Sequence, residues 1–347
     1  MKNSKQAMTL VETLVAISIA SMFAAVALPV MQNAREEARR SQCAMQLATL
    51  ANGAAMYELA NGVMPPVTTN DGIVNRLTDI NNTSHQQTGA IGYLLPFIGE
   101  QGIADLLVDV ATRPDIILDD TEFGDFGGLY SIPEMLEALM AKPERLICPS
   151  NADYSDALVE ELYTGNSQIR DSNVAYYSLF EINSTEFGRT SYLPVIGGFL
   201  AQTDISARGI DLFDHQVLGA MRNRELSIAA NDLVDGTSNT IAWGESLGLI
   251  LPPTAEDNET DQPHLKGVNS SLLNASIHTG HSYFLEQSIL FGSSEASIHW
   301  LIGSNHPDGN NVAMYDGSVR FLNRNTSRQV AAALGCGGDG WISPRSE

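Results

Sequence analysis

Basic residues are scarce in this 347-residue chain, which has 19 lysines and arginines against 41 aspartates and glutamates, a formal net charge of −22. A surface this acidic repels the phosphate backbone of nucleic acids and anionic membrane faces. The sequence also has no patch of interleaved basic and aromatic residues. The composition therefore argues against nucleic-acid binding, and it favours a soluble head in an exported compartment.

Cysteine is also rare: the chain contains only Cys43, Cys148 and Cys336. Because the number is odd, at least one thiol stays outside any disulfide formed within a single chain. Export permits one disulfide, but the sequence does not select the pair. Three separate thiols are an equally good interpretation.

Nucleotide-binding loops of the Walker and dinucleotide types are missing, and so are internal repeats. One G-x-S-x-G sequence, Gly244–Gly248, has Ser246 at its centre, and His306 follows it in the chain order of α/β-hydrolases. That motif must open a helix, whereas here residues 249–251 run into Pro252-Pro253. We therefore interpret the sequence as a strand end followed by a turn, and we expect a protein that is not an enzyme and has no catalytic residues.

Long apolar runs are absent except for one, from Ala7 to Met31, whose single charged residue is Glu12. The 22 uncharged residues from position 13 to position 34 extend roughly 33 Å as a helix, enough to cross a bilayer core of about 30 Å. A carboxylate within such a span is costly unless a charge compensates it. Cleavage after Ala7 supplies one, because the new amine of Met8 lies four residues from Glu12 on the same helical face.

This segment resembles the N-terminus of type IV prepilins and type II secretion pseudopilins. Lys2 and Lys5 match the basic leader, Met8 the methylated first mature residue, and Glu12 the glutamate at the fifth mature position. The resemblance implies cleavage at Ala7 and N-methylation of Met8 by a prepilin peptidase, and a role for Glu12 in subunit assembly. Ala7 departs from the glycine that usually precedes the cut.

Two simpler interpretations compete with prepilin processing. A general signal peptidase could cut after the A-x-A sequence Ala25-Val26-Ala27. An uncleaved signal anchor would instead hold Glu12 near the cytoplasmic headgroups. The length of the apolar run and the place of Glu12 inside it argue against an ordinary signal peptide.

The apolar pattern continues beyond the span. Its positions recur at spacings of four and three, which is typical of one face of a helix: Cys43, Leu47, Leu50, Ala54 and Tyr57. We therefore predict one helix, kinked at Pro29, from Met8 to about Ala60. The predicted organisation is a leader (1–7), a transmembrane helix segment (8–31), its amphipathic continuation (32–62) and a β-rich globular head (63–347).

Short apolar runs and frequent turn residues predict that the head is β-rich, which makes the whole an α+β protein. The expected strands are Arg145–Cys148, Val174–Ile182, Tyr192–Leu200 and Thr240–Trp243. The expected short helices are Pro133–Ala141 and Ser327–Leu334, the second with a capping box from Thr326 to Gln329. The expected inserted loops are Ala111–Gly128 and Leu251–Ser270.

A hairpin is predicted near the C-terminus, where Asp316-Gly317 joins two strand-like runs, Asn311–Tyr315 and Ser318–Leu322. His306 lies ten residues before Asp316. This pattern resembles the C-terminal H-x(9)-D-G motif of a family of prepilin-like proteins abundant in planctomycete-type bacteria, whose biochemical role is not established. Four further segments resemble that family in order: SQCAMQLATLANGAAMYELANGVMPP, LICPSNAD, NDLVDGTSNTIAWGES and ALGCGGDGW.

We interpret the motif residues His306, Asp316 and Gly317 as structural. Asp316 and Gly317 are assigned to the turn, and His306 is expected to be a loop side chain that hydrogen-bonds the hairpin. A catalytic pair of His306 and Asp316 is disfavoured because no third group stands at a suitable spacing.

Metal-ligand spacing is weak in this sequence. His278 and His281 form H-x-x-H, and His264 and His299 lie nearby, but no cysteine or carboxylate stands at a spacing typical of zinc sites. We therefore expect exposed loop histidines and no cofactor. The acidic composition leaves calcium open as a ligand of the head, although no EF-hand spacing occurs and no ligand residues can be named.

Together these patterns predict an exported pilin-like or pseudopilin-like structural subunit. It would be held in the inner membrane by a single span, with its head in the periplasm or at the cell exterior. Its expected partners are the prepilin peptidase and other pilin-like subunits in a pseudopilus or filament. Two alternatives are a membrane-anchored extracytoplasmic binding protein that does not polymerise and, less favoured, a tethered serine hydrolase acting through Ser246.

Overall fold

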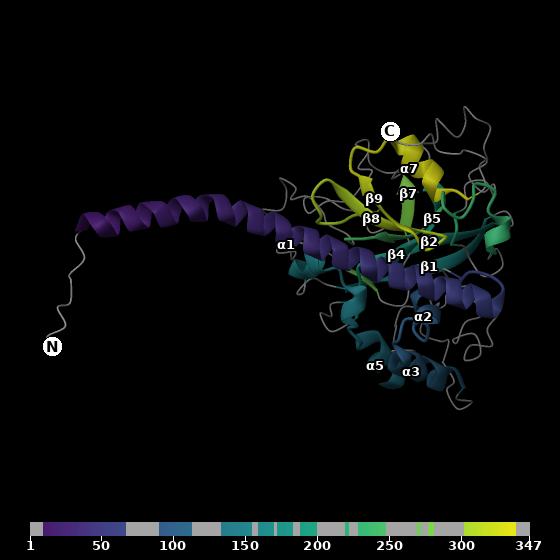
Figure 1. The fold of residues 1–347 in the computed structure, drawn as a ribbon. Coiled ribbons are helices and arrows are strands. Elements are labelled where there is room, and N and C mark those ends of the chain that lie inside the picture. Colours follow the sequence, from purple (N-terminus) through teal and green to yellow (C-terminus); the bar gives the residue numbers. More distant parts are fainter. Residues whose placement is uncertain are drawn as a thin grey trace, which may run out of the picture.

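A computed structural model of the chain describes residues 10–66, 90–112, 133–154, 159–169, 172–182, 188–199, 219–221, 228–247, 269–271, 277–280 and 302–337. Within these ranges the protein is an α+β structure with one long N-terminal helix and a head that contains two sheets. Figure 1 shows the first half of the helix projecting from the head and the second half running across it.

The long helix α1 spans Leu10–Asn61 and continues through Pro29 without a break. Its N-terminal half is exposed, and its most apolar stretch has no residue buried by the rest of the chain. By length and composition this half can cross a membrane. The helix ends at Asn61, and Gly62 follows it with φ +83°, the left-handed conformation that favours glycine after a helix.

Further helices and helical turns lie in the described head before the first strand. These are α2 (Ala90–Leu94), α3 (Gln101–Thr112), α5 (Pro133–Met140) and the 3₁₀ turn η2 (Glu144–Leu146). A second 3₁₀ turn, η3 (Pro149–Tyr154), follows η2 after two intervening residues and also precedes the first strand. The elements η5 (Ala230–Asp232) and α7 (Arg328–Gly335) come later in the chain. In Figure 1, α2, α3 and α5 lie on one side of α1, and α7 lies beyond the strands on the other.

The larger sheet has five strands in the order β7-β4-β5-β8-β9. Its strands are β4 (Tyr192–Phe199), β5 (Ile241–Glu245), β7 (Ile277–Gly280), β8 (Gly309–Met314) and β9 (Val319–Asn323). All neighbours are antiparallel except β4 and β7, which are parallel. The helix α1 packs across β5, β8 and β9 of this sheet.

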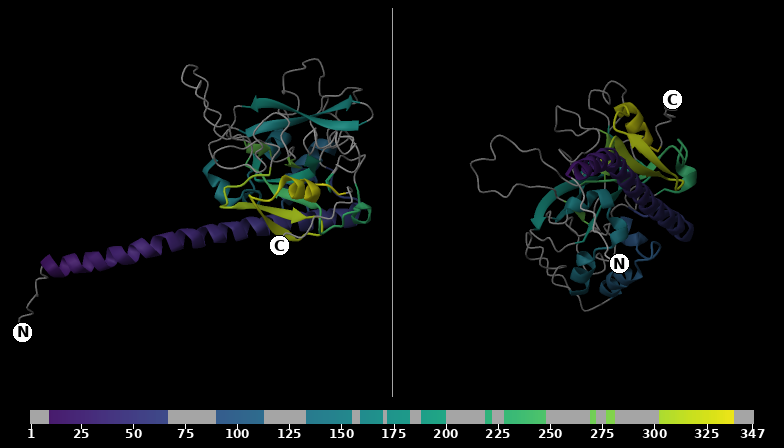
Figure 2. Two further views of the ribbon diagram at one scale, coloured as in Figure 1. Left: turned by 90° about the horizontal axis from the view of Figure 1, so that it is seen from above. Right: turned by 60° about the vertical axis from the view of Figure 1, so that its left-hand side comes forward.

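The smaller sheet has four strands in the order β2-β1-β6-β3. They are β1 (Val159–Ile169), β2 (Ser172–Ile182), β3 (Arg189–Thr190) and β6 (Asn269–Ser271). β1 and β2 form a long antiparallel pair, and β6 joins β1 in parallel. Figure 2 shows this pair on the side of the head away from α1.

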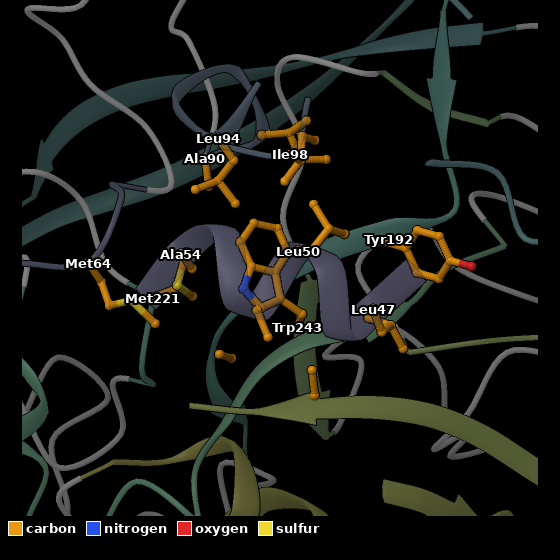
Figure 3. Close-up of a cluster of buried hydrophobic side chains, with 14 of the residues drawn as sticks. Leu47, Leu50, Ala54, Met64, Ala90, Leu94, Ile98, Tyr192, Met221 and Trp243 are labelled. Atoms are coloured by element: carbon orange, nitrogen blue, oxygen red, sulfur yellow. The ribbon is translucent and has the colours of Figure 1, made fainter. Parts of the chain in front are cut away.

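The core forms where the apolar stripe of α1 meets the larger sheet. Leu47, Leu50 and Ala54 are fully or almost fully buried, and Trp243 of β5 packs in the same cluster (Figure 3). Burying apolar area contributes about 25 cal/mol per Å², so this cluster stabilises the attachment of the head to the helix. The apolar stripe predicted from the sequence is confirmed.

Most expected elements occur within two residues of their predicted bounds. The helix from Met8 to about Ala60, the helices at Pro133–Ala141 and Ser327–Leu334, and the hairpin correspond to α1, α5, α7 and β8–β9. The strands expected at Val174–Ile182, Tyr192–Leu200 and Thr240–Trp243 correspond to β2, β4 and β5. The cap of α7 differs in its residue, because the Oγ atom of Ser327, not Thr326, accepts from the N–H of Val330.

The strand expected at Arg145–Cys148 is wrong. The chain there forms η2 and then η3, because Pro143 and Pro149 bracket the segment and neither can donate a ladder hydrogen bond. One sheet-like contact survives, from the N–H of Ser191 to the carbonyl of Leu146 at 2.8 Å. Of the expected loops, residues 113–128 and 251–268 lie outside the described residues, and residues 111–112 end α3.

Candidate functional site

The candidate site lies where α1 enters the head, and it is centred on His306. Its loop precedes β8, and the side chain is 1% exposed. The Nδ1 atom lies 2.7 Å from Oε1 of Glu36, and the Nε2 atom lies 3.2 Å from Oε1 of Glu245. We call these three residues the His306 bridge, because the imidazole joins the helix α1 to strand β5.

Each carboxylate of the bridge is held by further donors. Glu245, fully buried, accepts from the backbone N–H of Asn311 at 2.7 Å and from its side-chain amide at 2.9 Å. Glu36, partly exposed, accepts from Oγ of Ser150 at 2.9 Å. Both carboxylate oxygens that face the imidazole are therefore fixed in position.

The two carboxylates favour the charged imidazolium. Burial of the ring by itself lowers the pKa of His306, but the hydrogen bonds and negative charges of Glu245 and Glu36 outweigh it and raise the pKa above its usual value. With the ring protonated, each nitrogen donates to one carboxylate. A buried ion pair of this kind is stable only when its charges are fully hydrogen-bonded, which the contacts of Glu245 and Glu36 provide.

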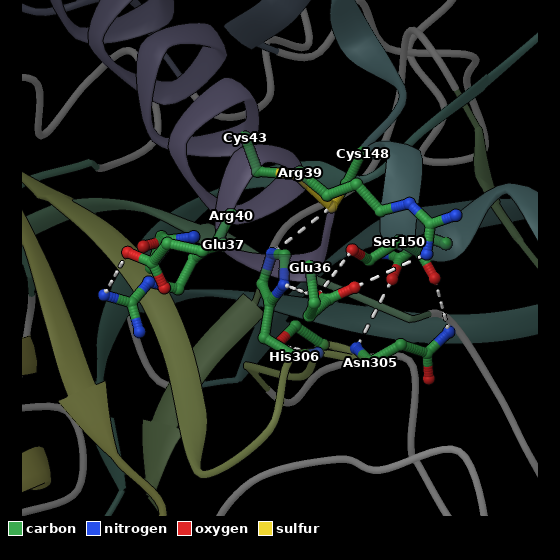
Figure 4. A network of polar contacts seen from close by, with 12 residues as sticks. Glu36, Glu37, Arg39, Arg40, Cys43, Cys148, Ser150, Asn305 and His306 are labelled. Carbon is green, nitrogen blue, oxygen red and sulfur yellow. Dashed lines mark hydrogen bonds and ion pairs between the residues drawn. A yellow bond between two sulfur atoms is a disulfide. The ribbon is translucent and has the colours of Figure 1, made fainter. Parts of the chain in front are cut away.

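A disulfide lies directly beside the bridge. Cys43 of α1 is bonded to Cys148, which lies between η2 and η3, 105 positions further along the sequence. The Sγ atom of Cys148 is 3.5 Å from Nε2 of His306. In Figure 4, dashed lines join the ring of His306 to Glu36 and to this disulfide. Cys336 is buried and lies outside the disulfide.

Further contacts fix the same stretch of α1 to the head. The guanidinium of Arg40 stacks over the ring of Phe321 on β9, 4.4 Å from the ring centroid. The amide of Gln46 donates to the carbonyl of Glu144 at 3.2 Å, and its oxygen accepts from the hydroxyl of Tyr192 at 2.6 Å. Burial and the charge of Glu245 raise the pKa of Tyr192, so its hydroxyl remains a donor.

The motif residues predicted to be structural have structural contacts, with one change of partner. Asp316 lies in the turn, where its Oδ1 atom accepts from the N–H and the hydroxyl of Ser318, and Gly317 has φ +84°. The expectation that the His306 side chain bonds the hairpin is wrong. The ring bonds α1 and β5, and it reaches the hairpin only through Glu245 and Asn311.

The G-x-S-x-G serine lies at the end of β5, as predicted. Ser246 is 2% exposed, and its backbone N–H donates to the carbonyl of Ser191. The strand ends at Glu245, and residues 246–247 are not helical. The ring nitrogens of His306 contact Glu36, Glu245 and Cys148, so the imidazole is engaged in the bridge.

The processing residues Ala7 and Met8 lie outside the described residues. Glu12 lies in the first turn of α1, on the exposed apolar half. Of the other histidines, His264, His281 and His299 lie outside the described residues, and His278 falls in strand β7. The calcium prediction stays a prediction.

Sequence reasoning did not predict the grouping around His306. One potential ligand atom from each of Cys43, Cys148, Glu245 and His306 lies within 4.8 Å of the other three. Spacing along the chain gave no signal, because the four residues come from distant segments. Each, however, belongs to a different segment of the family resemblance described above, and that shared membership is the signal that could have grouped them.

Two family models match the chain. Residues 32–329 match the family described as "Protein of unknown function (DUF1559)", and residues 2–28 match the prokaryotic N-terminal methylation motif. The chain belongs to the DUF1559 family. No curated protein and no solved structure matches it.

The methylation motif identifies this DUF1559 protein as a pilin-like protein that a prepilin peptidase processes. The motif covers the start of α1, the same helix whose apolar half is long enough to span a bilayer. The protein is therefore membrane-anchored through its N-terminal helix. The family match begins at residue 32, where α1 approaches the head, and it includes all members of the His306 bridge.

Proposed function

We propose that this protein is a structural subunit of a pseudopilus or filament, without enzymatic activity of its own. The inner membrane holds it by α1 before assembly, with the head in the periplasm or at the cell exterior. The observation that carries the proposal is the division of α1 into two halves. One half is apolar and exposed, and the other is locked into the head.

The exposed half of α1 is apolar around its whole circumference. Its exposed large apolar residues are Leu10, Val11, Leu14, Val15, Ile17, Ile19, Met22, Phe23, Val26, Leu28, Val30 and Met31. Such a surface needs lipid or other apolar helices around it. Exchange of lipid for neighbouring helices is the step that assembly would require.

Glu12 would favour contact with a neighbouring subunit over contact with lipid. A carboxylate in the apolar half is costly in lipid, and the N-terminal amine of a neighbouring processed subunit would compensate its charge. Each added subunit then places one Glu12 carboxylate beside the N-terminal amine of its neighbour within the apolar layer. The pairing therefore favours insertion beside an existing subunit over random association of helices.

The locked half of α1 would carry the head along with the helix. Between Glu36 and Gln46 the helix makes an ion bridge, a disulfide, a cation–π contact and a side-chain hydrogen bond. These reach three segments of the head, which contain Glu144 and Cys148, His306, and Phe321. The orientation of the head is therefore fixed relative to the helical face that bears Glu12. In a filament, the packing of the helices would set the position of every head.

The test compares two glutamates of α1 in cells that make the native assembly machinery. Glu12→Gln removes the charge in the apolar half and keeps the shape of the side chain. Glu37→Gln, whose partner is Arg40 at the exposed surface, is the matched control. The readouts are cysteine crosslinking between neighbouring helices, the amount of filament-sized material released by shearing, and the mass of the N-terminal peptide.

The proposal expects methylated Met8 in both variants, and strongly reduced crosslinking and sheared material for Glu12→Gln only. Equal crosslinking in Glu12→Gln and the wild type would refute the assembly role of Glu12. Correctly processed wild-type protein that stays monomeric in the membrane would favour the anchored binding protein instead.

A further inference from the structure

The cluster beside the disulfide contains the donor set of a metal site. It comprises two cysteine sulfurs, one imidazole nitrogen and one carboxylate oxygen, all within 4.8 Å of one another. All four residues are buried. Outside this cluster, in the described part of the chain, no other group of three or more such residues has this arrangement.

The distances suit a tetrahedral ion. Zinc holds sulfur at about 2.3 Å and nitrogen or oxygen at about 2.0–2.2 Å, which places neighbouring ligands roughly 3.3 to 3.8 Å apart. The Nε2 atom of His306 lies 3.5 Å from Sγ of Cys148 and 3.2 Å from Oε1 of Glu245. The two sulfurs are bonded to each other in the structure, and they must separate to act as ligands.

The surroundings also match those of a metal site. A histidine that binds zinc through one nitrogen usually donates its other N–H to a carboxylate, and Nδ1 of His306 lies 2.7 Å from Oε1 of Glu36. The ligating carboxylate is usually fixed by further donors, as Asn311 fixes Glu245. The groups that orient a zinc site are therefore in place around these four residues.

We propose that Cys43, Cys148, His306 and Glu245 form a structural zinc site when the Cys43–Cys148 disulfide is open. Thiolate and imidazole ligands select zinc over calcium or magnesium, which prefer oxygen. Four protein ligands with no exposed position are typical of a structural site and leave no place for substrate. The two sulfurs therefore have two alternative states, in which they either form the disulfide or both bind the zinc ion.

The chemistry balances in both directions. A phosphine or dithiol reductant supplies two electrons, the S–S bond breaks, and the two sulfurs take up two protons. Zinc then displaces these two protons and binds both thiolates, neutral Nε2 of His306 and the Glu245 carboxylate. Any proton on Nε2 also leaves, and Nδ1–H stays directed at Glu36. In the reverse direction a small-molecule disulfide accepts two electrons from the thiolates and leaves as two thiols, which restores the Cys43–Cys148 bond and releases the ion.

Both the disulfide and the bound zinc ion would join α1 to the segment after η2. Cys43 belongs to the helix, and the other three ligands belong to the head. The zinc form would therefore hold the helix and the head together in a chain whose disulfide has not yet formed or has been reduced.

The test uses the full chain in detergent micelles, freed of metal with a chelator. One sample keeps its disulfide, and the other is reduced with a phosphine under inert gas. Both are equilibrated with Zn²⁺, desalted and assayed for bound zinc by mass spectrometry, and both are titrated in parallel with Co²⁺. The proposal expects a single additional zinc ion per reduced chain, and a cobalt complex with tetrahedral visible bands and a thiolate-to-metal charge-transfer band.

Variants assign the ligands. The double variant Cys43→Ser, Cys148→Ser should lose the additional ion and the charge-transfer band. Any zinc that it still binds measures background binding by the other histidines. Cys336→Ser, which alters the cysteine outside the disulfide, is the matched control and should leave both signals intact. Glu36→Gln keeps all four ligands but weakens the support of His306, so zinc affinity should fall about 10- to 100-fold.

The wild-type comparison decides the proposal even if a variant fails to fold. A reduced chain that keeps its circular dichroism and binds no more zinc than the oxidised chain would overturn it. So would a reduced chain that loses its fold and does not recover it with zinc. A cobalt complex without the charge-transfer band would show that the thiolates are not ligands.

Discussion

The Nδ1 atom of His306 lies 2.7 Å from the Oε1 atom of Glu36, although 270 positions separate the two residues in the chain. One belongs to the loop before β8 and the other to the helix that leaves the membrane. The contact fixes one angular position of α1 against the head. It gives the histidine of the H-x(9)-D-G pattern a physical role in joining anchor and head.

Loss of the imidazole should destabilise the head strongly. His306→Ala leaves the buried Glu245 carboxylate without its ionic partner, and breaking a buried pair in this way costs about 3–5 kcal/mol. Urea unfolding of the disulfide-bonded chain in detergent, followed by the fluorescence of buried Trp243, measures the change. Arg39→Ala is the control, because the Arg39 side chain is about half exposed and its pair with Glu36 should contribute less than about 1 kcal/mol.

A second substitution tests the cause of that loss. Glu245→Gln in the His306→Ala background removes the buried charge, so part of the lost stability should return. A His306→Ala chain as stable as the wild type would show that the ring contributes little. A double variant no more stable than His306→Ala would show that the buried charge is not the source of the loss.

Removal of the disulfide should also lower stability. It closes a loop of 105 residues, and the chain-entropy estimate for such a loop is about 4–5 kcal/mol. Cys43→Ser with Cys148→Ser, compared with the wild type in the presence of a chelator, should have an unfolding free energy lower by that amount, which lowers the urea midpoint. The Cys336→Ser chain should unfold close to the wild type, and an equal loss in that chain would mean that cysteine removal in general, not the bridge, is responsible.

Alkaline pH should destabilise the head through Tyr192. Its pKa is raised in the folded state by burial and by Glu245, whereas the unfolded chain ionises near pH 10. The unfolded state therefore binds fewer protons above about pH 10, so the contribution is complete below that pH and declines as the pH rises further. The unfolding free energy, measured from pH 8 to 11, should fall less steeply for Tyr192→Phe than for the wild type.

Two effects of Tyr192→Phe on stability can be separated by their dependence on pH. This change also removes the hydrogen bond to Gln46, which should lower stability by about 0.5–1.5 kcal/mol at neutral pH. Only the slope at high pH reports the ionisation. Parallel curves for the two proteins over the whole range would contradict a raised pKa at this position.

Gly309 should not tolerate a side chain. A Cβ there would collide with the backbone oxygen of Leu322 and lie 2.8 Å from the ring of Phe321, both on the partner strand β9. Gly309→Ala should therefore cost about 1–3 kcal/mol through displacement of the hairpin. Gly102→Ala in α3, where nothing lies within 4 Å, is the control and should be neutral or stabilising by up to about 1 kcal/mol. Equal effects in thermal unfolding would refute the steric argument.

The elements that rest on local pattern could be predicted from the sequence. The long helix follows from its apolar run and stripe, and the β8–β9 hairpin follows from Asp316-Gly317 between apolar segments. The segment Arg145–Cys148 could not be predicted in this way. Its apolar residues fit a strand, but the flanking prolines and the bond between Cys148 and Cys43 give it a different conformation.

The site could be predicted only in part. His306 was identified by its place before the hairpin, but its partners Glu36 and Glu245 depend on how α1 crosses the sheet. The same holds for the choice of Cys43 and Cys148 among three cysteines. No local rule relates these positions, because packing of distant segments brings them together.

The position of Cys43 along α1 has a mechanical consequence. It lies at the membrane-facing end of the stripe that packs in the head, before Leu47, Leu50 and Ala54. A force that pulls on the anchoring half would meet a covalent bond before it meets the apolar contacts. Tension would therefore pass into the sheet through one sulfur link, and the helix could not be drawn out of the head turn by turn.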